Sequence, residues 1–277
     1  MILGIIGVGL MGGSLAMAAR EAKLFAEIIG ADNSEANLKT ACELKIIDRA
    51  LSEADLIAIS DLIVLAAPVE AIKAITPRLV GAKNSAVFTD LGSVKSAIIA
   101  AIPAEIRDRY VAAHPMCGTE YSGPKAAFAT LYKDRIAVLC DSEKNSLNAL
   151  RKVENLFLSI GMRIVKMPAR DHDRHAAFIS HLPHAISYAL ANSVLSQEDK
   201  GSILTLAAGG FRDMSRLAKS APSMWLDIFK QNREPLLQAF KIFTAEMASL
   251  EDDLKNGEWE SLESAMKNAN ALHQIFN

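Results

Sequence analysis

Three glycines near the amino terminus constrain the fold of this chain more than any other feature. In GIIGVGLMGGS, Gly7, Gly9 and Gly12 follow a short apolar run and precede a helical stretch, LAMAAREAKL. This spacing lets a backbone turn approach a dinucleotide pyrophosphate, while the helix amino terminus offers its free N–H groups. We therefore expect a cofactor loop that includes Leu10 and Met11. The alternative is a glycine-rich turn that holds no ligand.

Apolar runs typical of buried strands recur through the first 168 residues, with helical segments between them. The runs are MILGIIG, EIIGA, DLIVLAAP, AVFTDLG, YVAAHP, RIAVLCD and MRIVKM. Such alternation is typical of βαβ units. We predict an α/β fold, a Rossmann-type doubly wound and mostly parallel sheet over residues 1–168, followed by an all-α domain over residues 169–277. Several later helices are too apolar for one small bundle to cover, which favours a homodimer.

The composition is that of an ordinary globular protein, with 51% hydrophobic residues, 22% charged residues and a net charge of −2. A balance of this kind provides no general attraction to nucleic acid or to an anionic membrane. No apolar run is long enough to span a bilayer, and no signal peptide opens the chain. The cysteines lack the close pairing of a metal or redox motif. The three cysteines are Cys42, Cys117 and Cys140. We therefore expect a cytoplasmic protein that binds no metal.

Asp32 ends the second apolar run, 20 residues after Gly12. An acidic side chain at this place accepts hydrogen bonds from the adenosine ribose and repels a 2′-phosphate, which favours NAD over NADP. Asn33 and Ser34 follow, and neither is the arginine that a 2′-phosphate would need. The competing interpretation makes Asp32 a helix cap answered by Glu35 three residues later.

Ser93 and His114 follow successive predicted strands, in TDLGSVK and YVAAHPMCGTE. Strand ends of a parallel sheet lie at one edge, so both side chains can reach one small molecule. A neutral imidazole can take a proton from a substrate hydroxyl as hydride leaves the same carbon. Ser93 can orient that hydroxyl or the carboxamide of a nicotinamide. For His114 alone, a bond to backbone is the simpler interpretation, and Cys117 has no nearby base to make it a nucleophile.

Five motifs in this order give the chain a resemblance to a known family. GLMGGS, DLGSVK, HPMCGTE, SHLPHA and FRDMSRLAKSAPSMWLDI together resemble prephenate dehydrogenases of the TyrA type, from residue 4 to about residue 228. The resemblance implies a Rossmann domain joined to a helical dimerisation domain. It also implies the oxidation of prephenate with NAD to 4-hydroxyphenylpyruvate and carbon dioxide, in tyrosine biosynthesis.

The resemblance further implies roles for individual residues. His114 matches the histidine that bonds the ring hydroxyl, with Ser93 as its partner. His181 and His184 match the two histidines of the HLPH segment, which faces the cofactor cleft. The other substrate-binding candidates are Glu120, which matches an acidic pocket residue, Arg216, which matches an arginine that grips a carboxylate, and Arg212 nearby.

Simpler interpretations stay open for several of these residues. Four histidines fall between residues 172 and 184, which invites a metal site, but no HExxH pattern or cysteine set accompanies them. HLPH can also be a helix start with Pro183 in the first turn. The two arginines can form a solvated helix face with Asp213. Trp225 and Met224 read as interdomain core rather than substrate contacts.

Three rival functions remain. The first is arogenate dehydrogenase, because Met214, Ser215 and Ala221 depart from residues common in relatives and weaken any claim on fine substrate choice. The second is a 3-hydroxyacid or imine dehydrogenase, for which Lys219 would be the catalytic lysine. The third is a non-catalytic NAD-responsive binding protein, in which Ser93, His114 and Arg216 would have no common function.

Overall fold

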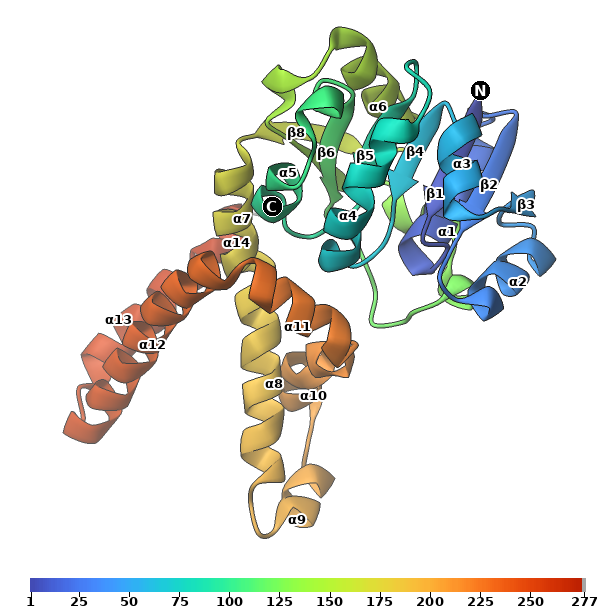
Figure 1. Ribbon diagram of the computed structural model, residues 1–277. Helices are drawn as coiled ribbons and strands as arrows, with labels where there is room; N and C mark the ends of the chain where they lie inside the picture. Colours follow the sequence, from blue (N-terminus) through green and yellow to red (C-terminus); the bar gives the residue numbers. More distant parts are fainter. Residues whose placement is uncertain (276–277) are drawn as a thin grey trace. The chain divides into compact units, whose positions relative to one another are not determined.

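The computed structural model describes residues 1–275, apart from the side chain of residue 273. The chain divides into two compact units, Met1–Arg233 and Glu234–Asn277. The domain boundary predicted near Pro168 falls within the first unit, between a strand and a helix, and it stays a prediction. Each unit is described by itself below (Figure 1).

The first unit is built on an eight-stranded sheet with the order β3-β2-β1-β4-β5-β6-β7-β8. All neighbouring pairs are parallel except β6 and β7. The mostly parallel, doubly wound sheet is therefore confirmed. The strands are β1 Ile2–Ile6, β2 Glu27–Ala31, β3 Arg49–Ala50, β4 Leu62–Leu65, β5 Val87–Asp90, β6 Tyr110–Pro115, β7 Ile136–Cys140 and β8 Arg163–Met167.

The reversal of β7 has a local cause. Parallel neighbours need a crossover, which is usually a helix. The link from β6 to β7 holds only two short 3₁₀ turns, Pro124–Ala126 and Ala129–Tyr132, so the chain turns back beside the strand that it has just left. The sequence did not indicate this reversal, nor the two-residue strand β3.

Helices cover both faces of the sheet, and each face has its own apolar core. Strands buried on both sides read as continuous apolar runs, which is why their positions were predictable. One face packs against α1 Leu10–Glu21, α2 Glu35–Glu43 and α6 Leu147–Ser159. The other packs against α3 Glu53–Ile59, α4 Val69–Ile75, α5 Ser96–Ala100, α7 Ala169–Ala176 and α11 Pro222–Gln231.

The alternation of side chains along β6 decides which way His114 faces. Val111 and Ala113 belong to the core on the α1 side, whereas Tyr110 and Ala112 belong to the core on the α7 side. Because successive side chains point to opposite faces, His114 shares the face of Tyr110 and Ala112. The histidine is thereby directed toward α7.

A continuous helical stretch follows β8. After α7, Ala177–His181 forms a π turn, and α8 Leu182–Leu195 continues from it, with Pro183 in its first turn. Proline lacks an N–H and crowds the carbonyl four residues earlier, so a widened turn just before it relieves both problems. Shorter helices complete the unit: α9 Lys200–Thr205, α10 Gly209–Ser215 and a 3₁₀ turn Arg216–Lys219.

The second unit is entirely helical over its described residues. It comprises most of α12 Arg233–Asn256, then α13 Trp259–Asn270 and α14 Leu272–Ile275. Large apolar side chains are exposed along these helices, namely Leu237, Ile242, Met247, Leu254, Trp259, Met266, Leu272 and Ile275. None of the described helices combines the length and apolar character that a membrane crossing requires.

Candidate active site

Several of the predicted site residues lie where strands of the sheet end, at one edge. The glycine loop follows β1, Ala66 follows β4 and Ser93 follows β5, while His114 lies at the end of β6. These four strands are parallel neighbours. The order reverses between β1 and β4, and open α/β sheets bind ligands at such a switch point.

The glycine loop fits a dinucleotide. Gly7 has a φ of +98°, and a Cβ there would overlap the carbonyl oxygen of Ala66. A Cβ on Gly12 would overlap the carbonyl oxygen of Gly7. Gly9 has open space where its side chain would be, which leaves room for a ligand. Gly7 and Gly12 are thus needed for the tight turn, and Gly9 keeps the loop accessible to a ligand.

The first turn of α1 presents free backbone donors at this loop. Gly9 occupies the N-cap position without a side-chain cap, and the first turn contains no acidic residue. The N–H groups of Leu10, Met11 and Gly12 therefore point at the space beside Gly9, together with the positive end of the helix dipole. This arrangement is suited to a pyrophosphate.

Asp32 is held at the end of β2 by two backbone N–H groups. Its carboxylate accepts hydrogen bonds from Val8 N at 2.9 Å and from Ser34 N at 2.8 Å. The cap of α2 is Ser34, whose Oγ accepts from Asn37 N at 3.3 Å. The interpretation of Asp32 as the helix cap is therefore wrong. Its carboxylate lies between the ends of the first two strands, beside the glycine loop.

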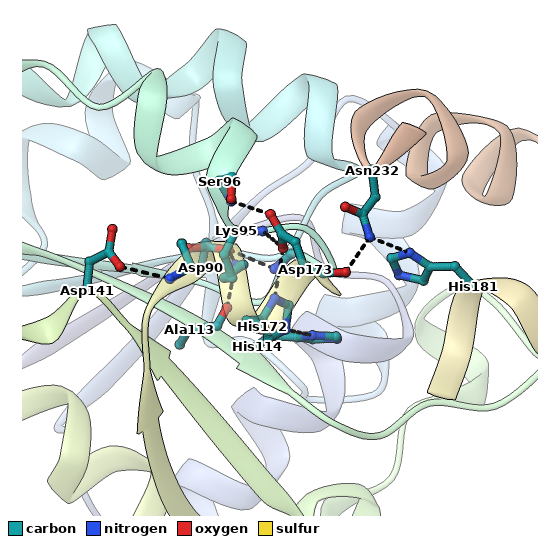
Figure 2. A network of polar contacts seen from close by, with 12 residues as sticks. Asp90, Lys95, Ser96, Ala113, His114, Asp141, His172, Asp173, His181 and Asn232 are labelled. Carbon is teal, nitrogen blue, oxygen red and sulfur yellow. Dashed lines mark hydrogen bonds and ion pairs between the residues drawn. The ribbon is translucent and has the colours of Figure 1, made fainter. Parts of the chain in front are cut away.

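His114 is nearly buried, with 8% of its surface exposed. Its Nδ1 lies 2.8 Å from Nε2 of His172, a residue of α7 (Figure 2). Burial is the largest cause that holds the pKa of His114 well below its ordinary value, and nearby His172, Lys95 and His181 lower this pKa further. The imidazole is therefore neutral near pH 7 and can accept a proton.

Asp173 anchors this pair of histidines. Its Oδ1 lies 2.9 Å from His172 Nδ1 and accepts from Lys95 N at 2.7 Å, and its Oδ2 accepts from Ser96 N at 2.8 Å. Burial alone would raise the pKa of Asp173, but these hydrogen bonds outweigh burial and lower it. The carboxylate is thus ionised although it is nearly buried.

Lys95 is completely buried and makes an ion pair with Asp90, the last residue of β5. Its Nζ also donates to the carbonyl oxygen of Ala113 at 2.6 Å. The carboxylate of Asp90 accepts in addition from Gly92 N at 2.8 Å. This buried cation ties the ends of β5 and β6 together directly behind His114.

His181 lies in the π turn and is fully buried. Asn232 Nδ2 is 2.9 Å from His181 Nδ1 and donates to the carbonyl oxygen of Asp173 at 2.8 Å (Figure 2). Burial lowers the pKa of His181 to about 4. Its Nε2 has no partner among the described residues, and the indole nitrogen of Trp225 is likewise buried without one.

His184 stacks on Trp225, with the ring centroids 3.5 Å apart. Its Nδ1 donates to the carbonyl oxygen of Ser180 at 2.9 Å, so the expected bond to neighbouring backbone is present. Burial lowers the pKa of His184; Arg216 lowers it further, against an opposing effect of the Ser180 bond. Trp225 is buried in the core, as expected, but Met224 is 41% exposed, so its placement in the core was wrong.

The remaining candidates make no hydrogen bond or ion pair with His114 among the described residues. Ser93 is half-buried in the loop after β5, and Arg212 and Arg216 are exposed. No ion pair joins either arginine to Asp213 among the described residues. Glu120 is half-buried and lines a shallow hollow of ≈ 680 Å³ in the loop after β6.

Two interpretations lose support from the structure. Burial raises the pKa of Cys117 to about 12, which leaves it protonated and unsuited to nucleophilic attack. No group of three histidine, cysteine or acidic side chains that could hold a metal ion occurs among the described residues. His172 instead directs both ring nitrogens at protein partners.

Sequence reasoning missed the second layer of this site: Asp90, Lys95, Asp173 and Asn232, together with the contact of His172. One signal was available, since an adjacent histidine and aspartate occur in PARDHDRH, the segment after the last strand. A histidine beside an acid is common on helix surfaces, however. Only the fold shows that this pair is buried against His114.

Comparisons with known proteins agree with the motifs. A family model described as the nucleotide-binding domain of prephenate dehydrogenase matches residues 15–166, and one described as its dimerization domain matches residues 168–268. A cyclohexadienyl dehydrogenase of Zymomonas mobilis is 33% identical over 253 residues, covering 90% of this chain and 86% of that protein.

Solved structures give the same result. Prephenate dehydrogenase of Aquifex aeolicus, in complex with hydroxyphenyl propionate and NAD+, has a TM-score of 0.93 at 29% identity and covers 100% of this chain and 98% of that chain. Synechocystis arogenate dehydrogenase has a TM-score of 0.83 at 26% identity, with 100% of both chains covered. The match to the nucleotide-binding domain, followed along the chain by the match to the dimerization domain, shows that this chain belongs to the prephenate dehydrogenase family.

Proposed function

We propose that the protein is an NAD-dependent prephenate dehydrogenase, which converts prephenate to 4-hydroxyphenylpyruvate and carbon dioxide in tyrosine biosynthesis. The observation that carries the proposal is the position of His114. A neutral imidazole lies at the carboxyl end of β6, on the sheet edge that also carries the glycine loop. Family membership and the likeness to the A. aeolicus enzyme, which binds NAD+, support it.

The cofactor proposed is NAD. Gly7, Gly9 and Gly12 leave room for a pyrophosphate at the start of α1. The bond from Val8 N holds the Asp32 carboxylate beside this loop, which supports its role toward the adenosine ribose. A carboxylate there accepts from ribose hydroxyls and repels the extra phosphate of NADP. When bound, the nicotinamide supplies the acceptor for the hydride.

The residues of the chain supply proton transfer and orientation. As the ring carbon that bears the hydroxyl loses hydride, His114 Nε2 takes the hydroxyl proton. The bond from the ring to its carboxylate then breaks, carbon dioxide leaves, and that electron pair makes the ring aromatic. The same proton returns from His114 to the phenolic oxygen, so no net proton is released. Ser93, on the neighbouring loop, orients the hydroxyl or the nicotinamide carboxamide.

Prephenate carries two carboxylates, and the net charge of the protein is −2, so local donors must bind them. Arg216 and Arg212 are exposed cations on adjacent turns after α8. A guanidinium binds a carboxylate through two parallel hydrogen bonds. His181 adds a neutral donor, and Glu120 shapes the pocket from the loop after β6. His184, whose Nδ1 donates to Ser180, offers the substrate an acceptor at Nε2. These roles belong to the proposal.

We also propose that the protein acts as a homodimer. The second unit exposes large apolar side chains along α12 and α13, and solvent-exposed apolar surface of this kind is typical of protein interfaces. The family model that matches residues 168–268 is a dimerization domain. Sedimentation at several concentrations tests the dimer, and a monomer at all of them would exclude it.

The test of function is turnover. Purified protein is mixed with NAD and prephenate, and then with NAD and arogenate, while NADH absorbance is followed. We expect turnover with prephenate; activity with arogenate alone would establish the first rival, and activity with neither would refute the proposal. A His114→Asn variant should bind NAD normally and lose most of its turnover. The matched control, His175→Gln, changes an exposed histidine of α7 and should be as active as wild type.

A further inference from the structure

The hydrogen bonds behind His114 determine where its proton sits. An ionised carboxylate has only acceptors, so Asp173 Oδ1 must receive a hydrogen from His172 Nδ1 across their 2.9 Å contact. Two backbone N–H groups, those of Lys95 and Ser96, hold that carboxylate in place and keep it ionised. The proton of a neutral His172 is therefore on Nδ1.

This assignment fixes the next one. A neutral His172 that carries its proton on Nδ1 has a lone pair on Nε2, which faces His114 Nδ1 at 2.8 Å. Two bare nitrogens would repel each other at this distance. Beside a neutral His172, His114 must therefore donate through Nδ1–H, which leaves Nε2 with a free lone pair. Figure 2 shows the chain from Asp173 through His172 to His114.

We propose that Asp173 and His172 are positioning residues, which hold His114 in the tautomer that can accept a proton at Nε2 and stabilise the imidazolium that forms. The proposal rests on the function proposed above. The three groups are nearly buried, with 8% of His114 and 3% of each of the others exposed, so water does not replace these bonds. An ionised carboxylate at the far end of the chain opposes the positive charge.

The surroundings of His114 make this support necessary. Lys95 is a buried cation that bonds the carbonyl of the preceding residue, Ala113, and His181 also affects the charge of His114. Burial is the largest effect that disfavours a positive charge on His114, and His172, Lys95 and His181 disfavour it further. The negative charges nearby are Asp173 and Asp90, and Asp90 is already paired with Lys95. Asp173, acting through His172, is thus the group available to stabilise protonated His114.

Asp173→Asn is the direct test. An asparagine keeps the size of the side chain, but it cannot accept from both backbone N–H groups and from His172 at once. We expect the hydrogen bond between the two imidazoles to reverse its direction, so that His172 donates to His114 and the proton of His114 moves to Nε2. Turnover should fall by about 10²-fold, while the dissociation constant for NAD stays unchanged.

A second variant tests the proposal even if Asp173→Asn does not fold. His172→Gln can place an amide oxygen where Nε2 was, which accepts from His114 Nδ1–H and preserves its tautomer. It removes the link to Asp173, so we expect a smaller loss of kcat than His172→Leu gives, with KM little changed. The control is again His175→Gln, whose residue is exposed on the same helix.

The decisive readout does not depend on turnover. In protein with ¹⁵N-labelled histidine, long-range ¹H–¹⁵N correlation spectra assign each ring tautomer. Protonated Nδ1 in wild-type His114, which shifts to protonated Nε2 in Asp173→Asn together with the loss of kcat, would support the proposal. An unchanged tautomer, or a changed tautomer with full kcat, would overturn it. If wild type turned over neither prephenate nor arogenate, the proposed function would fail, while the spectra would still decide the tautomer.

Discussion

Asn232 fixes the orientation of His181 through a single amide nitrogen. This Nδ2 donates to the carbonyl oxygen of Asp173 at 2.8 Å and lies 2.9 Å from His181 Nδ1. A carbonyl can only accept, so the nitrogen of the amide must face it, and His181 Nδ1 must also accept. The proton of neutral His181 is therefore on Nε2, a buried donor without a partner among the described residues.

Replacement of Asn232 should destabilise the protein. Asn232→Ala leaves His181 Nδ1 buried without a donor, while the Asp173 carbonyl keeps only the Ala177 N–H. The loss costs about 1–3 kcal/mol of the free energy of unfolding. Urea unfolding measures this loss. Asn192→Ala, at an exposed position of α8, is the control and should change stability by less than about 0.5 kcal/mol. Equal stability of the two variants would show that the amide bonds contribute little.

Buried neutral histidines should make the protein less stable in acid. Burial lowers the pKa of His181 to about 4, whereas an unfolded histidine titrates near 6.5. Between these values the unfolded chain binds more protons, so the stabilisation is complete above about pH 6.5 and is lost as the pH falls toward about 4. From about pH 7 to about pH 5, His181 alone should account for about 2 kcal/mol.

Urea unfolding at both pH values gives the measurement, and a pair of variants separates this histidine from the rest. His181→Gln should lose less stability on acidification than wild type. His175→Gln changes an exposed histidine and should lose as much as wild type. The pKa values of His114 and His184 are lowered in the same direction, so some loss should persist in both variants. The same acid loss in His181→Gln as in wild type would contradict the assignment.

The sequence predicted those parts of the fold that depend on local pattern. Most of the seven predicted strands were visible because strands buried on both faces are continuous apolar runs. The glycine loop was visible because its turn excludes side chains. The strand β3 Arg49–Ala50 is exposed and only two residues long, so no apolar pattern marks it. The direction of β7 depends on the path of a loop, which composition does not reveal.

The site also contains residues that sequence motifs predict and residues that only the tertiary structure brings together. Family motifs named His114, at the end of β6, and His181, in the π turn before α8. Lys95 reads as a surface cation, yet it is completely buried against Asp90. The contact of His114 with His172 joins residues 58 positions apart, so its existence depends on how α7 packs on the sheet. Supporting residues of this kind follow from tertiary packing and not from spacing.

Asp32 should set the choice between NAD and NADP. Asp32→Ala removes the acceptor for ribose hydroxyls and the repulsion of a 2′-phosphate, so NAD should bind more weakly and the preference over NADP should shrink. Fluorescence titration with both dinucleotides measures the ratio of dissociation constants. Ser34→Ala removes only the cap of α2, at a cost of about 1 kcal/mol in stability, and should leave that ratio intact. An unchanged ratio in Asp32→Ala would exclude a role in cofactor choice.

Arg216 should act in substrate binding more than in chemistry. Removal of one charged hydrogen-bonding group costs about 1.5–3 kcal/mol, so Arg216→Ala should raise KM for prephenate by about 10- to 100-fold with a smaller effect on kcat. The KM of Arg212→Ala for prephenate tests the second candidate in the same way. The control is Lys230→Ala, which removes an exposed cation of α11. Arg216 also lowers the pKa of His184, so Arg216→Ala should raise that pKa in an NMR titration. A raised pKa with unchanged KM would place Arg216 beside His184 but outside the carboxylate site.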